Sequence, residues 1–371
     1  MTLVEVSAKF EGKVRPFVVS NLPSWASVFL FSRGRKLFLE KFVKERPEKR
    51  DIPKDLEVVC WGLRFQSPLM NAAGMFKDKD AHEIVAAQGA GAYLRGTDVW
   101  SPYRGNKRAS IRNPVAFFPR SGASLNWLGL PGDGIEANLP RVSRAEKIEG
   151  CPYGCSLMGD PRIEDEEKRL CYLVAGMFDY ADAGVDFLED NFSCPNTGDQ
   201  TPDLKHLRKQ IRYVGDNFIS IVGRKVPVIA KLSVDWPIRD VKETMDMLFD
   251  AGFSGVNFGN TSINYLQHGI NISAKERGLY NFFFELFGGG VGGRPLKEYS
   301  LELASEAARY VKEGPPGQEF HVIRTGGVES WRDVLQSRNE GIPLNGWFTG
   351  YWEAFAKHGH DIYIEIFREA A

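Results

Sequence analysis

The fold of this chain is constrained above all by an alternation between strand-type and helix-type spacing of its apolar residues. From about Val58 onward, short apolar runs typical of buried strands are separated by longer stretches with helical spacing. Such alternation predicts right-handed strand–helix–strand units and a parallel sheet. The predicted strands are residues 68–72, 92–95, 155–158, 187–191, 228–231, 256–259, 321–325 and 346–348, and the clearest helices between them are residues 163–183, 238–251 and 301–311.

About eight such repeats favour a closed barrel, because an open sheet of that size has no obvious place to stop. A chain of 371 residues has room for one barrel with extensions or for two ordinary domains. We therefore expect an α/β fold, a (β/α)8 TIM barrel at residues 56–371, preceded by an N-terminal helical extension at residues 1–55.

The N-terminal segment differs from the rest of the chain in its pattern of charged and apolar residues. Residues 33–46 hold six Lys or Arg against two Glu, interleaved with apolar residues, and Trp25, Val28 and Phe29 form an apolar stripe before them. This pattern predicts a short helix or pair of helices that ends at Pro47. Two interpretations stay open, a structural helix packed on the barrel and a basic amphipathic surface that docks on a membrane or a partner.

Composition excludes several classes. A net charge of −1 gives no field that favours nucleic acid, and no 18-residue apolar run predicts a spanning helix. No secretory signal opens the chain, and five cysteines are few and odd in number, so we expect a reducing, cytoplasmic location, with peripheral membrane attachment left open. Cys151 and Cys155 have too few neighbouring ligands for a metal or cluster, which predicts reduced, partly buried thiols and no metal site.

The most distinctive motif is Asn-Phe-Ser-Cys-Pro-Asn-Thr at residues 191–197, at the end of a predicted strand. The Cys194 thiol lies between two amides, Asn191 and Asn196. Amides can read the edge of a planar uncharged ring, and a thiol can take a proton where its surroundings favour the thiolate. In a barrel the carboxyl ends of the strands carry the chemistry, and the glycine turns at residues 326–327 and 349–350 suit a phosphate.

Ten short pieces, in order, carry a resemblance. They are residues 68–74, 89–93, 104–106, 126–130, 191–197, 227–232, 255–262, 292–296, 325–328 and 349–350. Together they resemble the dihydroorotate dehydrogenases, FMN-dependent barrel enzymes of pyrimidine synthesis, over about residues 62–357. The resemblance implies oxidation of L-dihydroorotate to orotate, with a proton taken from C5 and hydride passed from C6 to FMN.

The resemblance also assigns roles. Cys194 would be the base, and the Lys231 ammonium would stabilise negative charge on the reduced flavin. The residues expected to bind substrate are Lys77, Asn126, Leu128, Gly129, Leu130, Asn191, Asn196, Asn260 and Thr261. Those expected to bind FMN are Ala73, Gly74, Thr97, Ser156, Asn191, Lys231, Gly293, Gly326, Gly327, Thr349 and Gly350.

The chain also departs from the family pattern. A cysteine base is similar to the soluble class, whereas Lys77 and the N-terminal extension are similar to the membrane-associated class. Gly96 stands where the soluble class has a lysine, and Gly132 where the family usually has Asn. Two alternatives therefore stay open, an FMN oxidoreductase for another cyclic amide and a non-catalytic flavin-binding barrel subunit.

The partners are less defined than the site. The second electron acceptor could be a quinone, fumarate, a flavin/iron–sulfur partner subunit or oxygen, and a homodimer is an open possibility. No nucleic acid partner is expected. The N-terminal segment is expected to cap the barrel near the flavin or substrate entrance and to contribute to acceptor access.

Overall fold

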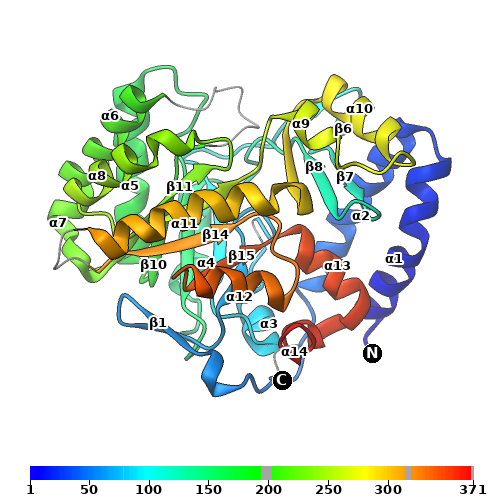
Figure 1. Cartoon of the computed structure of the whole chain (residues 1–371), viewed down its shortest axis with the longest axis horizontal. Helices are drawn as coiled ribbons and strands as arrows, with labels where there is room; N and C mark the ends of the chain where they lie inside the picture. The colour runs from blue at the N-terminus through cyan, green and yellow to red at the C-terminus, as the bar shows by residue number, and fades with distance from the viewer. Residues whose placement is uncertain (78, 194–202, 315–318, 369–371) are drawn as a thin grey trace.

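Eight parallel strands form the centre of the protein (Figure 1). The computed structural model describes residues 1–77, 79–193, 203–314 and 319–368. In spatial order the strands are β3 (Leu69–Asn71), β15 (Leu344–Trp347), β14 (His321–Thr325), β12 (Gly255–Asn260), β11 (Val228–Ser233), β10 (Phe187–Asn191), β9 (Tyr153–Leu157) and β4 (Tyr93–Asp98). Each of the eight predicted strands overlaps one of these, so that part of the prediction is confirmed.

The sheet closes on itself where β3 meets β4. The Asn71 side chain donates from Nδ2 to the carbonyl of Leu94 at 2.8 Å, and Oδ1 accepts from the amide of Leu94 at 3.2 Å. Beyond it, the amide of Gly74 donates to the carbonyl of Gly96 at 2.6 Å. At this β3–β4 seam the Asn71 side chain thus replaces part of the backbone hydrogen-bond ladder. The expected barrel is confirmed.

Helices surround the barrel. They are α3 (His82–Gln88), α4 (Ile135–Ser143), α5 (Glu166–Asp182), α6 (Leu204–Val214), α7 (Ser220–Val222), α8 (Val241–Asp250), α11 (Lys297–Glu313), α12 (Trp331–Asn339), α13 (Thr349–His358) and α14 (Ile362–Arg368). The three predicted helices correspond to α5, α8 and α11. A short 3-10 turn, Ile238–Asp240, precedes α8 and accounts for its earlier predicted start.

Side chains alternate between the two faces of the sheet, as the period of a strand requires. On β10, Leu188 packs in the large cluster between sheet and helices, while Phe187 lies in the barrel interior. Phe65 joins Phe187 and Ile229 there. It comes from a hairpin of β1 (Val58–Cys60) and β2 (Leu63–Phe65). The amino-terminal end of the barrel is therefore filled with apolar side chains.

A second, antiparallel sheet was not predicted. Its order is β13 (Gly290–Gly293), β8 (Ala123–Asn126) and β7 (Val115–Phe118). Leu125 and Val291 pack in a cluster with residues of α2 (Ser24–Phe42) and α10 (Arg277–Leu286). Smaller additions are β5 (Lys107–Arg108), β6 (Ile111–Arg112) and α9 (Tyr265–Gly269). The second sheet is thus covered on one face, which leaves its other face for the site described below.

Two helices precede the barrel strands, α1 (Leu3–Asn21) and α2, drawn in blue in Figure 1. α1 packs on α13, and α2 packs on β7 and α10. The helical segment predicted before Pro47 corresponds to α2, which ends at Phe42. The other helix, α1, starts at Leu3 with a capping box from Thr2 and Glu5 and was not singled out within the expected extension. Arg15 occupies a buried position on α1. A charged residue there interrupts the apolar spacing by which the sequence would indicate this helix. The domain boundary at residue 55 stays a prediction.

Within the described residues, no helix has both the length and the apolar character needed to cross a membrane.

Candidate active site

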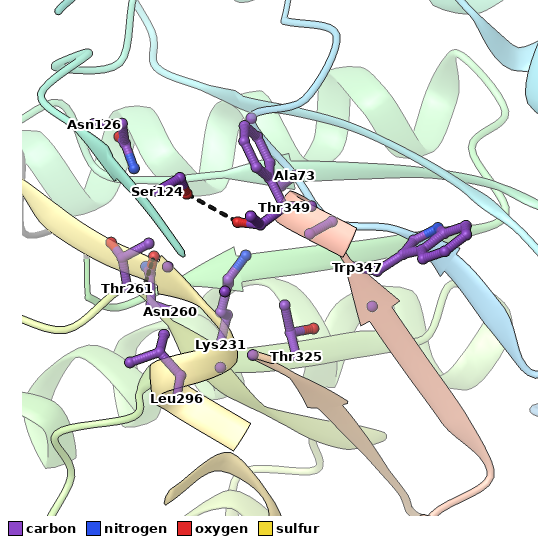
Figure 2. A pocket seen from close by; sticks show the side chains of 18 of the residues that line it. Ala73, Ser124, Asn126, Lys231, Asn260, Thr261, Leu296, Thr325, Trp347 and Thr349 are labelled. Atoms are coloured by element: carbon purple, nitrogen blue, oxygen red, sulfur yellow. Dashed lines mark hydrogen bonds between the residues drawn. The ribbon is translucent and has the colours of Figure 1, made fainter. Parts of the chain in front are cut away.

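A cavity opens at the carboxyl ends of the barrel strands, between them and the second sheet (Figure 2). It encloses about 890 Å³, including the part open to solvent. The predicted residues that line it are Ala73, Gly74, Lys77, Thr97, Asn126, Leu128, Leu130, Asn191, Lys231, Asn260, Thr261, Gly293, Gly326, Gly327, Thr349 and Gly350.

Four other predicted residues stand apart from this lining. Cys194 and Asn196 lie outside the described residues. Ser156 is not part of the lining, but its hydroxyl is 2.9 Å from that of the lining residue Thr97. Gly129 lies between the lining residues Leu128 and Leu130, and a Cβ there would meet the side chain of Asn106.

Asn191 is the centre of a fixed amide network. Its Nδ2 donates to Thr97 Oγ1 at 3.0 Å, and its Oδ1 accepts from Asn260 Nδ2 at 3.0 Å. The amide of Ser193 also donates to Asn191 Oδ1, at 3.2 Å, and Asn260 Nδ2 donates to the carbonyl of Ser193. The residue immediately before Cys194 is therefore held by two amide side chains. This arrangement presents oriented donors and acceptors to a polar ring without adding charge.

Lys231 projects from β11 into the cavity (Figure 2). It is 4% exposed. Its Nζ lies 3.4 Å from Oε1 of Glu189 on β10. Glu189 Oε2 accepts from Asn257 Nδ2 at 2.8 Å. Glu189 was not predicted as a site residue, although its place two residues before Asn191 puts both side chains on the interior face of the strand.

The glycine turns form a close-fitting cradle at one end of the cavity. A Cβ on Gly327 would lie 2.6 Å from Lys297 Cα, and one on Gly350 would lie 2.5 Å from the carbonyl oxygen of Val328. Helix α13 begins at Thr349, so its first amides carry no intrahelical acceptor. Free amides at a helix amino terminus favour an anion. This end of the pocket suits a phosphate group.

A chain of hydrogen bonds fixes the loop that carries Asn260 and Thr261. Ser262 Oγ donates to Asp235 Oδ1 at 2.6 Å. His268 Nε2 lies 2.8 Å from Ser262 Oγ, so the ring nitrogen is the donor. Burial lowers the pKa of His268, which keeps the ring neutral near pH 7. The loop is thus held in one conformation beside the amide network.

Several lining residues were not predicted. They are Ala72, Ser124, Gly259, Gly292, Leu296, Thr325, Val328, Gly346, Trp347 and Phe348. Six of them lie within predicted strands, at or near the carboxyl ends, and that position could have identified Ala72, Gly259, Thr325, Gly346, Trp347 and Phe348. Ser124 gave no such signal because it belongs to the unpredicted sheet. Its hydroxyl is 2.9 Å from Thr349 Oγ1 and so ties that sheet to α13 (Figure 2).

Two features singled out in the sequence lie away from the pocket. Cys151 and Cys155 are free thiols with no exposed surface, so the expectation of partial burial was wrong. They sit where β9 begins against the helix layer, and burial raises the pKa of both thiols. Gly132 pairs with Tyr103, whose amide donates to the Gly132 carbonyl at 2.8 Å. Among the described residues, no group of three His, Cys, Asp or Glu side chains could hold a metal ion.

Comparisons with known proteins agree with this geometry. Residues 55–369 match the family model of dihydroorotate dehydrogenase. A dihydroorotate dehydrogenase (quinone) from Arthrobacter sp. (strain FB24) is 27% identical over 329 residues, which are 86% of this chain and 85% of the relative. One from Marinomonas sp. (strain MWYL1) is 24% identical over 350 residues, 91% of this chain and 90% of the relative.

A solved structure supports the fold. The dihydroorotate dehydrogenase of Eimeria tenella in complex with ferulenol superposes with a TM-score of 0.69 at 20% identity, and the match covers 91% of this chain and 92% of the other. The family model spans almost all of the barrel together with the residues that line its pocket. The chain therefore belongs to the dihydroorotate dehydrogenase family.

Proposed function

We propose that this chain oxidises L-dihydroorotate to orotate in the described pocket, with Cys194 as the base and Lys231 beside the flavin. Family membership makes the chain an FMN-dependent oxidoreductase of pyrimidine biosynthesis. The observation that carries the proposal is the joint presence of a buried lysine, an amide network and two glycine turns at a helix amino terminus in one cavity. FMN, when bound, supplies the acceptor for hydride.

The residues present fit FMN. The cradle of Gly327 and Gly350 would hold the phosphate through backbone amides at the start of α13. A side chain at either glycine would collide with neighbouring backbone, so this tight packing of the two turns requires glycine at both positions. Lys231 would place its ammonium against the ring edge that becomes negative on reduction. Thr325 Oγ1, buried and without a hydrogen-bond partner in the described part of the chain, offers a further polar contact.

The amide network and the neighbouring lysine suit the substrate. Asn191, Asn260 and Thr261 would bind the uncharged edge of a pyrimidine ring, and Lys77 would add a positive charge near its carboxylate. Asn260 also holds the carbonyl of Ser193, the residue before Cys194. The network would thus orient the ring and the start of the segment that brings the base. An ordinary thiol pKa of about 8.5 leaves a usable thiolate fraction near neutrality.

We propose a quinone as the second electron acceptor, as in the names of the curated relatives. Helices α1 and α2 carry exposed apolar side chains, namely Leu3, Val6, Phe10, Phe17, Trp25, Phe29, Leu30 and Leu37. Exposed Lys9, Lys13, Arg33, Lys36 and Lys41 accompany them. Such a surface would attach to an anionic membrane reversibly and would release in salt.

This surface connects to the pocket. Arg35 of α2 donates from Nη2 to the carbonyl of Gly74 at 3.4 Å, and Gly74 lines the cavity. The α1–α2 pair would therefore bring an apolar acceptor from the membrane to the flavin. The homodimer expected as an open possibility stays a proposal, which light scattering of the purified protein would test.

The decisive experiment is anaerobic mixing of the purified flavoprotein with dihydroorotate. The flavin absorption should bleach. Cys194→Ala should keep FMN and orotate binding and slow the bleaching about 10²-fold or more, as expected for loss of a general base. Cys194→Ser should keep some activity, shifted to higher pH.

Each other outcome selects a different conclusion. Near-normal bleaching by Cys194→Ala would remove Cys194 from the mechanism. Bleaching by another cyclic amide alone would favour a different substrate. A bound flavin that no such compound reduces would favour the non-catalytic barrel subunit.

A further inference from the structure

A buried carboxylate lies directly beneath the pocket and has no role in the assignments above. The Glu189 side chain is 1% exposed and the Lys231 side chain 5% exposed, with 3.4 Å between Nζ and Oε1. Oε1 has no hydrogen-bond partner among the described residues, whereas Oε2 is held by Asn257. The Oε1 charge therefore faces the lysine and is otherwise uncompensated.

The apolar surroundings make burial of the Glu189–Lys231 ion pair costly in free energy. The barrel interior next to it is apolar, with Phe187, Ile229 and Ile323 among its members. Burying two charges costs several kcal/mol for each ion, and an apolar pair often stabilises a fold as well or better. Packing alone does not explain the choice of a carboxylate here. A role in the chemistry of the neighbouring lysine does.

Other charged groups near the pair do not replace Glu189. β12 contains no titratable residue, and Lys231 is the sole titratable residue of β11. Asp190 follows Glu189 and faces the helix layer, and burial together with the charge of Glu189 raises its pKa to about 8. It is therefore mainly protonated at neutral pH. Lys77, in the pocket wall, adds positive charge. Among the described residues, Glu189 is the anion that faces Lys231.

We propose that Glu189 is a positioning residue that keeps Lys231 protonated and directed at the flavin before any electron arrives. The inference rests on the proposed flavin contact of Lys231. A buried ammonium without an anion beside it loses its proton readily. With Glu189 present, the ammonium is in place while the flavin is oxidised. Two-electron reduction of FMN bound there would then take up one proton on the flavin, and Lys231 would gain none.

Glu189→Gln tests this proposal because glutamine keeps the shape and the contact to Asn257 but removes the charge. In the variant, Lys231 should be neutral over the oxidised flavin and should take up a proton when negative charge develops on the ring. Two protons then accompany two electrons instead of one. The midpoint potential of bound FMN, measured by dye equilibration from pH 6 to 9, should fall with pH about twice as steeply as in the wild type. Glu189→Asp, which retains the charge, should keep the wild-type slope.

An unchanged slope and potential in Glu189→Gln would overturn the inference. Should that variant fail to bind FMN, the double variant Glu189→Gln/Lys231→Met decides. Recovery of FMN binding would show that the loss arose from Lys231 without its carboxylate partner and would support the inference, whereas continued loss would assign Glu189 to packing. Lys231→Met alone tests the underlying function. If it leaves the potential unchanged, the proposed flavin contact is wrong whatever Glu189→Gln shows.

Discussion

Removal of the Arg15 guanidinium should destabilise the contact between the N-terminal helices and the barrel. Arg15 is 6% exposed and pairs with Glu353 of α13 and with Glu11 one turn earlier in α1. Its guanidinium carbon lies 5.3 Å from the centre of the Phe117 ring. Arg15→Met keeps most of the apolar stem and removes the charge, which leaves the Glu353 carboxylate without its partner on α1.

The structure sets the size of the effect. Breaking a buried ion pair by removing one partner costs about 3–5 kcal/mol. Glu353 retains 27% side-chain exposure, so the low end of about 3 kcal/mol applies. The lost cation–π contact adds about 0.5–1 kcal/mol. We therefore expect the free energy of unfolding to fall by about 3–4 kcal/mol near neutral pH.

The effect should depend on pH in a defined direction. Burial raises the pKa of Glu353 above 4.5, and Arg15 is the main influence that lowers it again. Without Arg15, the folded-state pKa of Glu353 rises further. A carboxyl whose folded pKa exceeds its unfolded value destabilises the fold while ionised, and stability returns as pH falls through the folded pKa. The deficit of Arg15→Met should therefore be largest at neutral pH and shrink toward pH 4.5.

Urea unfolding followed by circular dichroism and tryptophan fluorescence, at neutral pH and near pH 5, gives the comparison. Glu353→Gln and the double variant complete a thermodynamic cycle, in which the double variant should lose less than the sum of the two single changes. FMN content, measured in parallel, controls for damage to the pocket. A loss below about 1 kcal/mol, an additive cycle or a deficit independent of pH would each refute the reasoning.

Three further outcomes follow from the site. Gly327→Ala should lower FMN affinity at least about tenfold, or about 1.4 kcal/mol, in a fluorescence titration, because the backbone is at φ +76° and the new Cβ meets Lys297; unchanged affinity would contradict the phosphate cradle. Asp235→Asn weakens the hold on Ser262 and should reduce orotate affinity about tenfold, read from the flavin spectrum, while FMN binding stays the same; an equal loss of both would point to general unfolding. Deletion of residues 1–50 in a Glu353→Gln background should spare reduction by dihydroorotate more than reoxidation by quinone in rapid mixing, and normal reoxidation would leave that segment with a packing role alone.

The barrel was readable from sequence because its strands are buried on both faces. Such strands appear as short apolar runs, and the predicted ranges overlap all eight strands of the sheet. The second sheet was not readable. β13 is Gly-Val-Gly-Gly at Gly290–Gly293, which has the composition of a loop, and its strands pair antiparallel outside the strand–helix repeat. Ser124 was missed for the same reason.

Charged residues at buried positions account for the remaining differences. Glu189 stands in a predicted strand, and the parallel pairing of that strand with β11 brings it to Lys231. Arg15 interrupts the apolar face of α1, and its partner Glu353 is distant in sequence. Pairwise compensation between distant residues leaves no local pattern, so a single sequence could not reveal either pair. The strand-end residues of the site, by contrast, follow from topology alone.

The junction between β3 and β4 at Asn71, where a side chain replaces part of the backbone hydrogen-bond ladder, lies directly beside the ligand cavity. Ala73 and Gly74 follow β3, and Thr97 belongs to β4, so the two sides of the join both line the pocket. A bound molecule would span the join and brace it against local opening. Amide protons along β3 and β4 should therefore exchange with solvent more slowly when the pocket is filled, whereas those of the continuously paired β10 and β11 should change little. Hydrogen exchange at β3 and β4 would then report whether the cavity is occupied.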